Sequence, residues 1–142
     1  MKAPDPDFVA RVRASFHEQR FMTTLGAMLD AVEPGAVTIR VPFRRELTQQ
    51  DGFLHAGVLA SVADSACGYA AFSLMPATAR VLSIEFKVNM LAPATGDAIV
   101  RASVIRAGKR IMVCRADVFS SVDGSEKLVA AMQGTMMVVE DQ

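Results

Sequence analysis

The hydrophobic pattern of the chain contains one long apolar run and several alternating segments. Residues 56–75 are apolar on nearly every side, which predicts a helix buried within the protein and ended by Pro76. Residues 80–91 alternate between apolar and polar positions, which predicts a strand whose two faces differ. Its apolar face is expected to carry Leu82, Ile84, Phe86, Val88 and Met90, and its polar face Ser83, Glu85, Lys87 and Asn89.

The remaining segments complete the expected architecture. Apolar residues at helical spacing predict an N-terminal helix over about residues 7–20. Alternation and turn residues predict a strand pair at 25–33 and 36–43 before the central helix, and strands at 97–106, 110–121 and 127–139 after it. Short turns join the four strands that follow the central helix, so we expect them to pair as consecutive antiparallel neighbours. The pattern therefore predicts an α+β fold, a curved antiparallel sheet wrapped around a long central helix.

Composition narrows the class of protein. With 142 residues the chain is expected to form one domain, over residues 1–142. The net charge is zero and no basic block occurs, so neither nucleic acid nor a membrane is expected as the main partner. The N-terminus has no apolar signal core, which favours a cytoplasmic protein. The two cysteines lack metal-ligand spacing, so buried thiols are expected and no metal site.

Two side chains near the central helix could carry acid–base chemistry at neutral pH. His55 stands at the start of the apolar run and Asp64 in its middle. A carboxylate in so apolar a helix is costly unless it has a partner, so Asp64 is a candidate working group. The structural alternatives are that His55 caps the helix and that Asp64 is bonded to Ser61 or Ser65.

These residues belong to a longer motif. Gln49, Gly52, His55, Gly57 and Asp64 form the pattern Q-x-x-G-x-x-H-x-G, followed by an aspartate nine residues after the histidine. With the segments 82–86 and 91–97, this motif resembles the hotdog-fold acyl-CoA thioesterases of the PaaI type. The family commonly has His-Gly-Gly, where this chain has Ala56, and often has asparagine where Gln49 stands.

The resemblance implies hydrolysis of acyl-CoA thioesters without a metal or redox cofactor, coenzyme A being part of the substrate. Asp64 would be the base that activates water, or a nucleophile. The Ala56 amide, alone or with that of Gly57, would polarise the carbonyl at the helix N-terminus. Gln49 and His55 would orient the loop or the substrate. Ser83 matches a family position near the attacking water, although an ordinary strand serine explains it equally well.

Coenzyme A carries phosphates, so basic residues are expected near the mouth of the site. The candidates are Arg80, Lys87, Arg106, Lys109 and Arg110. The loop residues Gly52 and Phe53 are further binding candidates. An apolar acyl pocket is expected to draw on Phe53, Leu54, Phe72 and Met75.

The spacing of His55 and Asp64 predicts an oligomer. Nine helical residues turn by about 900° and rise about 13 Å, so one helix cannot aim both side chains at one carbonyl. Two antiparallel subunits can, which predicts a homodimer with shared sites, and the resemblance extends this to a homotetramer. Two other functions remain open: an acyl-thioester hydratase or dehydratase, and an acyl-CoA-binding protein without catalysis.

Overall fold

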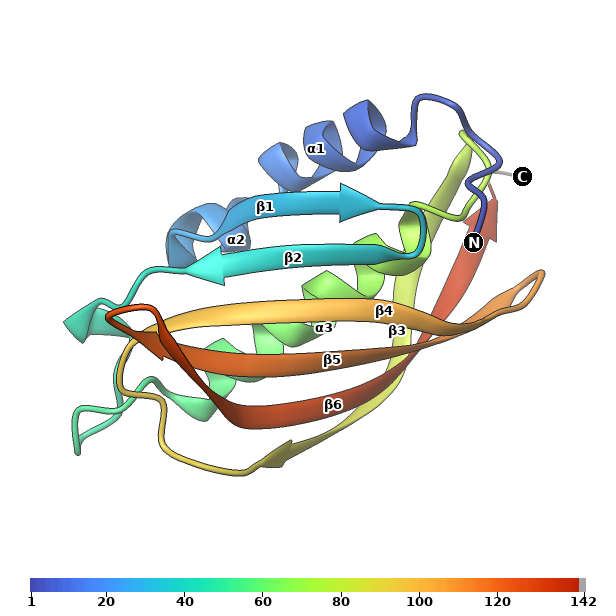
Figure 1. The fold of residues 1–142 in the computed structure, drawn as a ribbon. Helices are drawn as coiled ribbons and strands as arrows, with labels where there is room; N and C mark the ends of the chain where they lie inside the picture. Colours follow the sequence, from blue (N-terminus) through green and yellow to red (C-terminus); the bar gives the residue numbers. More distant parts are fainter. Residues whose placement is uncertain (141–142) are drawn as a thin grey trace.

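The computed structural model, which describes residues 1–140, consists of a curved sheet with a long helix on its concave side (Figure 1). All six strands are antiparallel, in the order β1-β2-β4-β5-β6-β3. The predicted α+β architecture with a central helix is confirmed. In chain order the elements are α1 (Phe8–Glu18), α2 (Arg20–Leu25), β1 (Met28–Glu33), β2 (Ala36–Val41), the 3₁₀ turn η1 (Arg45–Leu47), α3 (Ala56–Phe72), β3 (Ala79–Met90), β4 (Asp97–Ala107), β5 (Ile111–Val122) and β6 (Ser125–Glu140).

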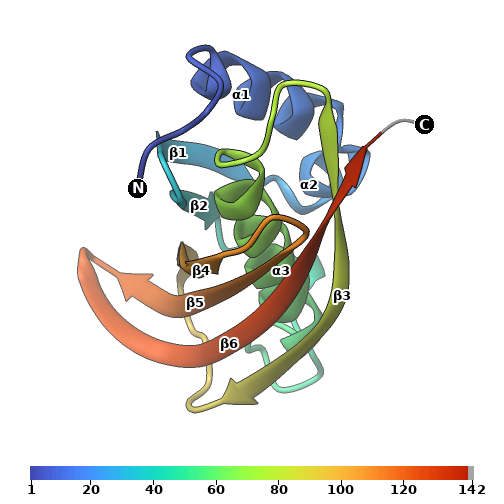
Figure 2. The ribbon, with the colours of Figure 1, turned by 90° about the vertical axis from the view of Figure 1, so that its right-hand side faces the viewer.

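The pairing of β3 differs from the sequence prediction. β3 pairs with β6 and not with β4, which lies between β2 and β5. Figure 2 shows β3 at one margin of the sheet, beside β6. The prediction that the last four strands pair consecutively is therefore right for β4, β5 and β6 and wrong for β3. The segment 91–96 crosses the end of the sheet, where the Leu91 N–H bonds to the carbonyl of Val129 at 2.8 Å.

A β-bulge changes which side chains of β3 face the helix. Ser83 pairs with Met136 and Glu85 pairs with Thr135, so Ile84 is an extra residue on the β3 side. Since neighbouring residues of β6 point to opposite faces, Ser83 and Glu85 also do. The predicted polar face holding both residues is therefore wrong. The bulge points Ser83 towards α3, while Val88 beyond it still packs against the core.

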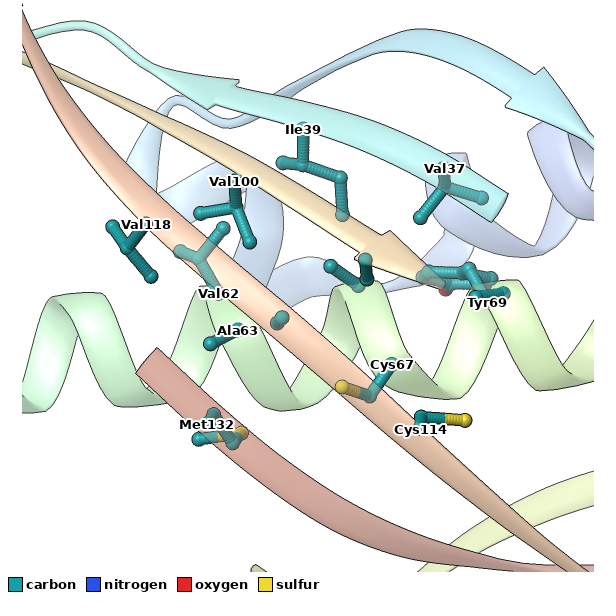
Figure 3. Packing of buried hydrophobic residues seen from close by; sticks show 14 of the residues in the cluster. Val37, Ile39, Val62, Ala63, Cys67, Tyr69, Val100, Cys114, Val118 and Met132 are labelled. Carbon is teal, nitrogen blue, oxygen red and sulfur yellow. The ribbon is translucent and has the colours of Figure 1, made fainter. Parts of the chain in front are cut away.

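The core lies between α3 and the concave face of the sheet (Figure 3). The contacting face of α3 is built from small and medium side chains, among them Val62, Ala63 and Cys67, all fully buried. Such side chains let the helix approach the strands closely. Cys67 and Cys114 are both free and buried, as expected, and their mutual contact together with burial raises the pKa of the Cys67 thiol. Within residues 1–140, no helix reaches the length and hydropathy of a membrane-spanning segment.

The two predicted helices have different bounds in the structure. The N-terminal helix, expected over about 7–20, is two helices broken at Gln19, whose backbone is extended at φ −75° and ψ 93°. The central helix, expected over about 56–75, ends at Phe72. Residues 73–75 continue as turns, with the Leu74 N–H bonded to the Ala71 carbonyl at 2.9 Å.

Arg11 fastens α1 to the C-terminal end of α3. Its Nη2 donates to the carbonyls of Phe72 at 3.1 Å and Met75 at 2.8 Å, and its Nε donates to Asp5 Oδ2 at 2.7 Å. The guanidinium also lies over the Phe72 ring, 4.1 Å from its centroid. Arg11 thereby satisfies carbonyls that the end of a helix leaves without partners.

Candidate active site

Gln49 organises the loop that precedes α3. The loop is closed by a bridge between Thr48 and Leu54, and the Gln49 N–H donates to the Phe53 carbonyl at 2.8 Å. The Gln49 side-chain oxygen accepts from the backbone N–H of Asp51 and, at 3.4 Å, from that of Phe53. In a single chain, Gln49 therefore fixes the shape of its own loop.

The start of α3 presents one backbone donor without an acceptor. His55 is the N-cap, and its Nδ1 accepts from the Gly57 N–H at 2.8 Å. A Cβ on Gly57 would lie 2.9 Å from that nitrogen, so the cap requires glycine there. No residue of 1–140 accepts from the Ala56 N–H. This exposed amide points out of a helix N-terminus, where negative charge is favoured.

Asp64 and Ser83 form a direct pair between α3 and β3. The Ser83 hydroxyl donates to Asp64 Oδ1 at 2.7 Å, and its oxygen also lies 3.4 Å from the sulfur of Met136. The alternative partners of Asp64 bond elsewhere: Ser61 donates to the Gly57 carbonyl at 2.6 Å, and Ser65 to Gln19 at 3.4 Å. Asp64 is half-buried, and no side chain or backbone group of residues 1–140 donates to its second oxygen.

The pair borders a cleft of about 360 Å³ between α1, α3 and β3. Gln19 contributes a polar wall, since its Nε2 donates to Ser65 Oγ at 3.3 Å and its Oε1 accepts from the Tyr69 hydroxyl at 3.4 Å. Burial raises the pKa of Tyr69, so this hydroxyl keeps its proton at neutral pH. Sequence reasoning missed Gln19 and Tyr69, because neither belongs to a motif and the helix break at Gln19 contains no glycine or proline.

The cleft and the loop at residues 49–57 are separate in a single chain. None of the loop residues lines the cleft beside Asp64. Along α3, Asp64 lies eight residues after Ala56, a rise of about 12 Å. One chain therefore does not bring the free amide and the carboxylate to one reacting centre.

The predicted binding residues fall into several places. Four basic residues lie at the end of the sheet where β3 begins and β4 turns into β5, namely Arg80, Arg106, Lys109 and Arg110. The backbone of residue 110 bonds β6 next to the position that pairs with Arg80. Lys87 lies apart from this basic cluster, in the middle of β3 and on the outer face of the sheet.

The predicted apolar pocket is not assembled in one chain. Phe53 and Leu54 precede α3, whereas Phe72 and Met75 lie at its other end. Leu54 and Met75 are buried in the core. Gly52, in the same loop as Phe53, is exposed and adopts φ +85°, a conformation that favours glycine. Within residues 1–140 no three His, Cys, Asp or Glu side chains are placed to hold a metal ion.

Known proteins share both the sequence pattern and the fold of this chain. A family model described as the Thioesterase superfamily matches residues 51–127. A relative from Saccharolobus solfataricus, named as a predicted esterase, is 31% identical over 134 residues, which cover 94% of this chain and 87% of the relative. The crystal structure of a thioesterase family protein from Silicibacter pomeroyi has a TM-score of 0.93 at 47% identity, covering 94% of this chain and 99% of that one. The PaaI protein of the E. coli phenylacetic acid degradation operon shares the fold, with a TM-score of 0.84 at 19% identity and 94% of each chain covered. The predicted hotdog fold is confirmed.

Proposed function

The chain belongs to the thioesterase superfamily and is a thioester hydrolase, and from this premise we propose that it hydrolyses acyl-CoA thioesters at a site shared by two subunits. The observation that carries the proposal is the 2.7 Å contact from the Ser83 hydroxyl to Asp64 beside a cleft. This contact fixes one carboxylate oxygen and leaves the other for chemistry. The free Ala56 amide supplies the complementary group, a donor for a developing oxyanion.

The proposed reaction has two steps. Asp64 removes a proton from a water molecule, and the oxygen of that water attacks the thioester carbon; in the alternative route, Asp64 attacks the carbon itself and water then cleaves the anhydride. The carbonyl oxygen becomes an oxyanion bound by the Ala56 N–H of the other subunit. The carbonyl re-forms as the C–S bond breaks, and the thiolate of coenzyme A leaves and takes up a proton.

The exposed edge of the sheet supports the dimer. Within residues 1–140, β3 pairs only with β6 and its other edge is open, and β3 carries Leu82 at 57% and Ile84 at 52% exposure. A long, apolar edge strand readily pairs with a strand of another chain, because its backbone N–H and C=O groups lack partners. Two β3 strands paired in antiparallel fashion would extend the sheet and place the two α3 helices side by side in opposite directions. The N-terminus of one helix would then face the middle of the other, where Asp64 lies.

Within this dimer, we assign the remaining predicted residues to supporting roles. Gln49 and His55 hold the loop and the first turn of α3 in the shape that exposes the Ala56 amide. The basic cluster of Arg80, Arg106, Lys109 and Arg110 would bind the phosphates of coenzyme A.

Release of free thiol from a panel of acyl-CoAs tests the proposed function. We expect thiol release from at least one member of the panel, at a rate proportional to the enzyme concentration. Water addition to an enoyl-CoA without thiol release would instead favour the hydratase. Tight binding without turnover across the panel would favour the non-catalytic function and contradict the proposal.

Replacing Ala56 with proline tests the oxyanion donor. Proline lacks the N–H but is tolerated at the first position of a helix, and the preceding His55 already has φ −60° and ψ 138°, which suits a residue before proline. We expect kcat to fall by about 10²–10³-fold, the effect of removing one oxyanion-hole donor. The fold should persist, as measured by thermal melting. An Ala56→Ser variant keeps the amide and should keep most of the activity; equal losses in both variants would contradict the assignment.

A further inference from the structure

The cleft beside Asp64 has the size and charge of a pocket for a small uncharged group. Its volume of about 360 Å³ lies near the lower end of ligand pockets, which run from about 300 to 1,000 Å³. Among the residues that the structure describes, its lining includes two carboxylates, Glu18 and Asp64, and no lysine or arginine. Such a lining repels the phosphates of coenzyme A as well as any acyl group that ends in a carboxylate.

One wall of this cleft is polar and held in place. The ring of Tyr69 packs edge-on against Phe16, at a centroid distance of 5.7 Å, and against Phe72 at 6.4 Å. Tyr69 is only 6% exposed, so its hydroxyl has a fixed position. Its contact with Gln19 measures 3.4 Å, and those between Gln19 and Ser65 measure 3.3 and 3.4 Å, all longer than ordinary hydrogen bonds. The carboxamide of Gln19 is therefore weakly satisfied and free to bond a ligand more closely.

The floor of the cleft is a glycine within the central helix. Gly68 lies one helical turn after Asp64 and lines the same cleft. A Cβ at this position would meet no atom within 4 Å, so any side chain there would occupy the cleft and not the core. Glycine inside a helix is unfavourable. No neighbouring atom requires a glycine at position 68, so packing does not explain the space that Gly68 leaves.

We propose that this cleft is the acyl pocket and that Gln19, with Tyr69, makes the enzyme select short, uncharged acyl groups that carry a hydroxyl. The inference rests on the proposed hydrolysis of acyl-CoA thioesters and names the substrate class of that site. Asp64 lies at the end of the cleft that receives the thioester. Gly68 leaves space for the acyl chain, and the Gln19 carboxamide forms a hydrogen bond with the hydroxyl of the substrate. Gln19 is thus a specificity-determining residue on the N-terminal segment, outside the family motif.

A matched set of six-carbon substrates tests the selection. We expect kcat/KM to be highest for one or more hydroxyhexanoyl-CoAs with the hydroxyl at carbon 3, 4, 5 or 6, lower for hexanoyl-CoA and lowest for adipyl-CoA. The variant Gln19→Leu has a similar volume and no hydrogen-bonding group. It should reduce the preference for the best hydroxylated substrate over hexanoyl-CoA by about tenfold, the effect of one hydrogen bond. The variant Gln133→Leu, on the exposed outer face of β6, should leave the preference unchanged.

The size of the pocket is tested at Gly68. We expect Gly68→Leu to lower kcat/KM for hexanoyl-CoA far more than for acetyl-CoA, because the added side chain fills the cleft. Gly68→Ala should melt no lower than the wild type and have an intermediate effect on the same ratio. Equal losses on both substrates with a normal melting curve would overturn the placement of the acyl group.

A binding measurement makes the test independent of catalysis. The chain has one tyrosine and no tryptophan, so its intrinsic emission reports Tyr69 alone. Titration with hydroxyhexanamides should change this emission at lower concentration than hexanamide does, and Gly68→Leu should abolish both changes. Hydrolysis with an unchanged substrate preference in Gln19→Leu would overturn this inference alone. Absence of thiol release from every acyl-CoA would overturn the proposed function, whatever the emission shows.

Discussion

Replacing Asp64 with asparagine is expected to lower kcat for thioester hydrolysis by about 10³-fold, within the range of about 10²–10⁴ assigned to a positioned general base. Asparagine matches aspartate in size and its side-chain oxygen can still accept from Ser83, which donates to Asp64 at 2.7 Å. The substitution therefore removes the basic oxygen while the contact between α3 and β3 stays. Steady-state thiol release measures kcat, and thermal melting should show a change of only a few degrees.

Two further variants separate chemistry from structure at Asp64. Asp30→Asn, in an exposed ion pair of β1 with Arg40, should leave kcat unchanged. Ser83→Ala removes the hydrogen bond to the Asp64 carboxylate and should give an intermediate loss of kcat. Ser83→Thr keeps a hydroxyl and should restore part of that kcat. An Asp64→Asn enzyme that keeps more than about a tenth of wild-type kcat would exclude Asp64 as base or nucleophile.

Mixing two inactive variants is expected to restore activity if the site is shared. One chain carries Asp64→Asn and the other Ala56→Pro, so each homodimer lacks one essential group in both of its sites. In a heterodimer, one site combines two intact halves and the other combines both defects. Random exchange makes half of the dimers heterodimers, so the mixture should reach about a quarter of wild-type activity.

The design of this mixing experiment depends on proof that exchange has occurred. Two tags of different mass allow heterodimers to be isolated and counted before the assay. A double variant carrying both substitutions, mixed with either single variant, should stay inactive because no site is complete. Verified heterodimers without activity would contradict the shared site and place both groups in the same chain.

Local pattern predicted the elements of this fold well. The strands over 97–106, 110–121 and 127–139 alternate by themselves, and the structure has β4, β5 and β6 within three residues of those bounds. The helix at 56–75 was recognisable because its apolar character needs cover on all sides. The motif pointed to Asp64 and the family resemblance to Ser83, and the structure places these two residues in contact. The catalytic and binding roles, the tetramer and the cytoplasmic location stay predictions.

Long-range pairing could not be read from the same pattern. A six-residue turn can close a hairpin or span three strand spacings of about 4.8 Å, so its length does not distinguish β4 from β6 as the partner of β3. The bulge at Ile84 is set by register with β6, and it reverses the face of every residue after it. The break at Gln19 could not be predicted, because the sequence around it contains no glycine or proline.

The attachment of α1 has a consequence for how molecules enter and leave the enzyme. This helix buries only Val12 and Phe16, and Arg11 anchors it to the carbonyls of Phe72, the last residue of α3, and Met75 just beyond it. Elements with few buried contacts open locally at a small fraction of the free energy of global unfolding. We therefore expect α1 to detach as a unit while the curved sheet stays intact. Residues of α1 and Gln19, which follows it, line the cleft beside Asp64. We therefore expect local unfolding of this N-terminal segment to control the entry and release of the acyl group.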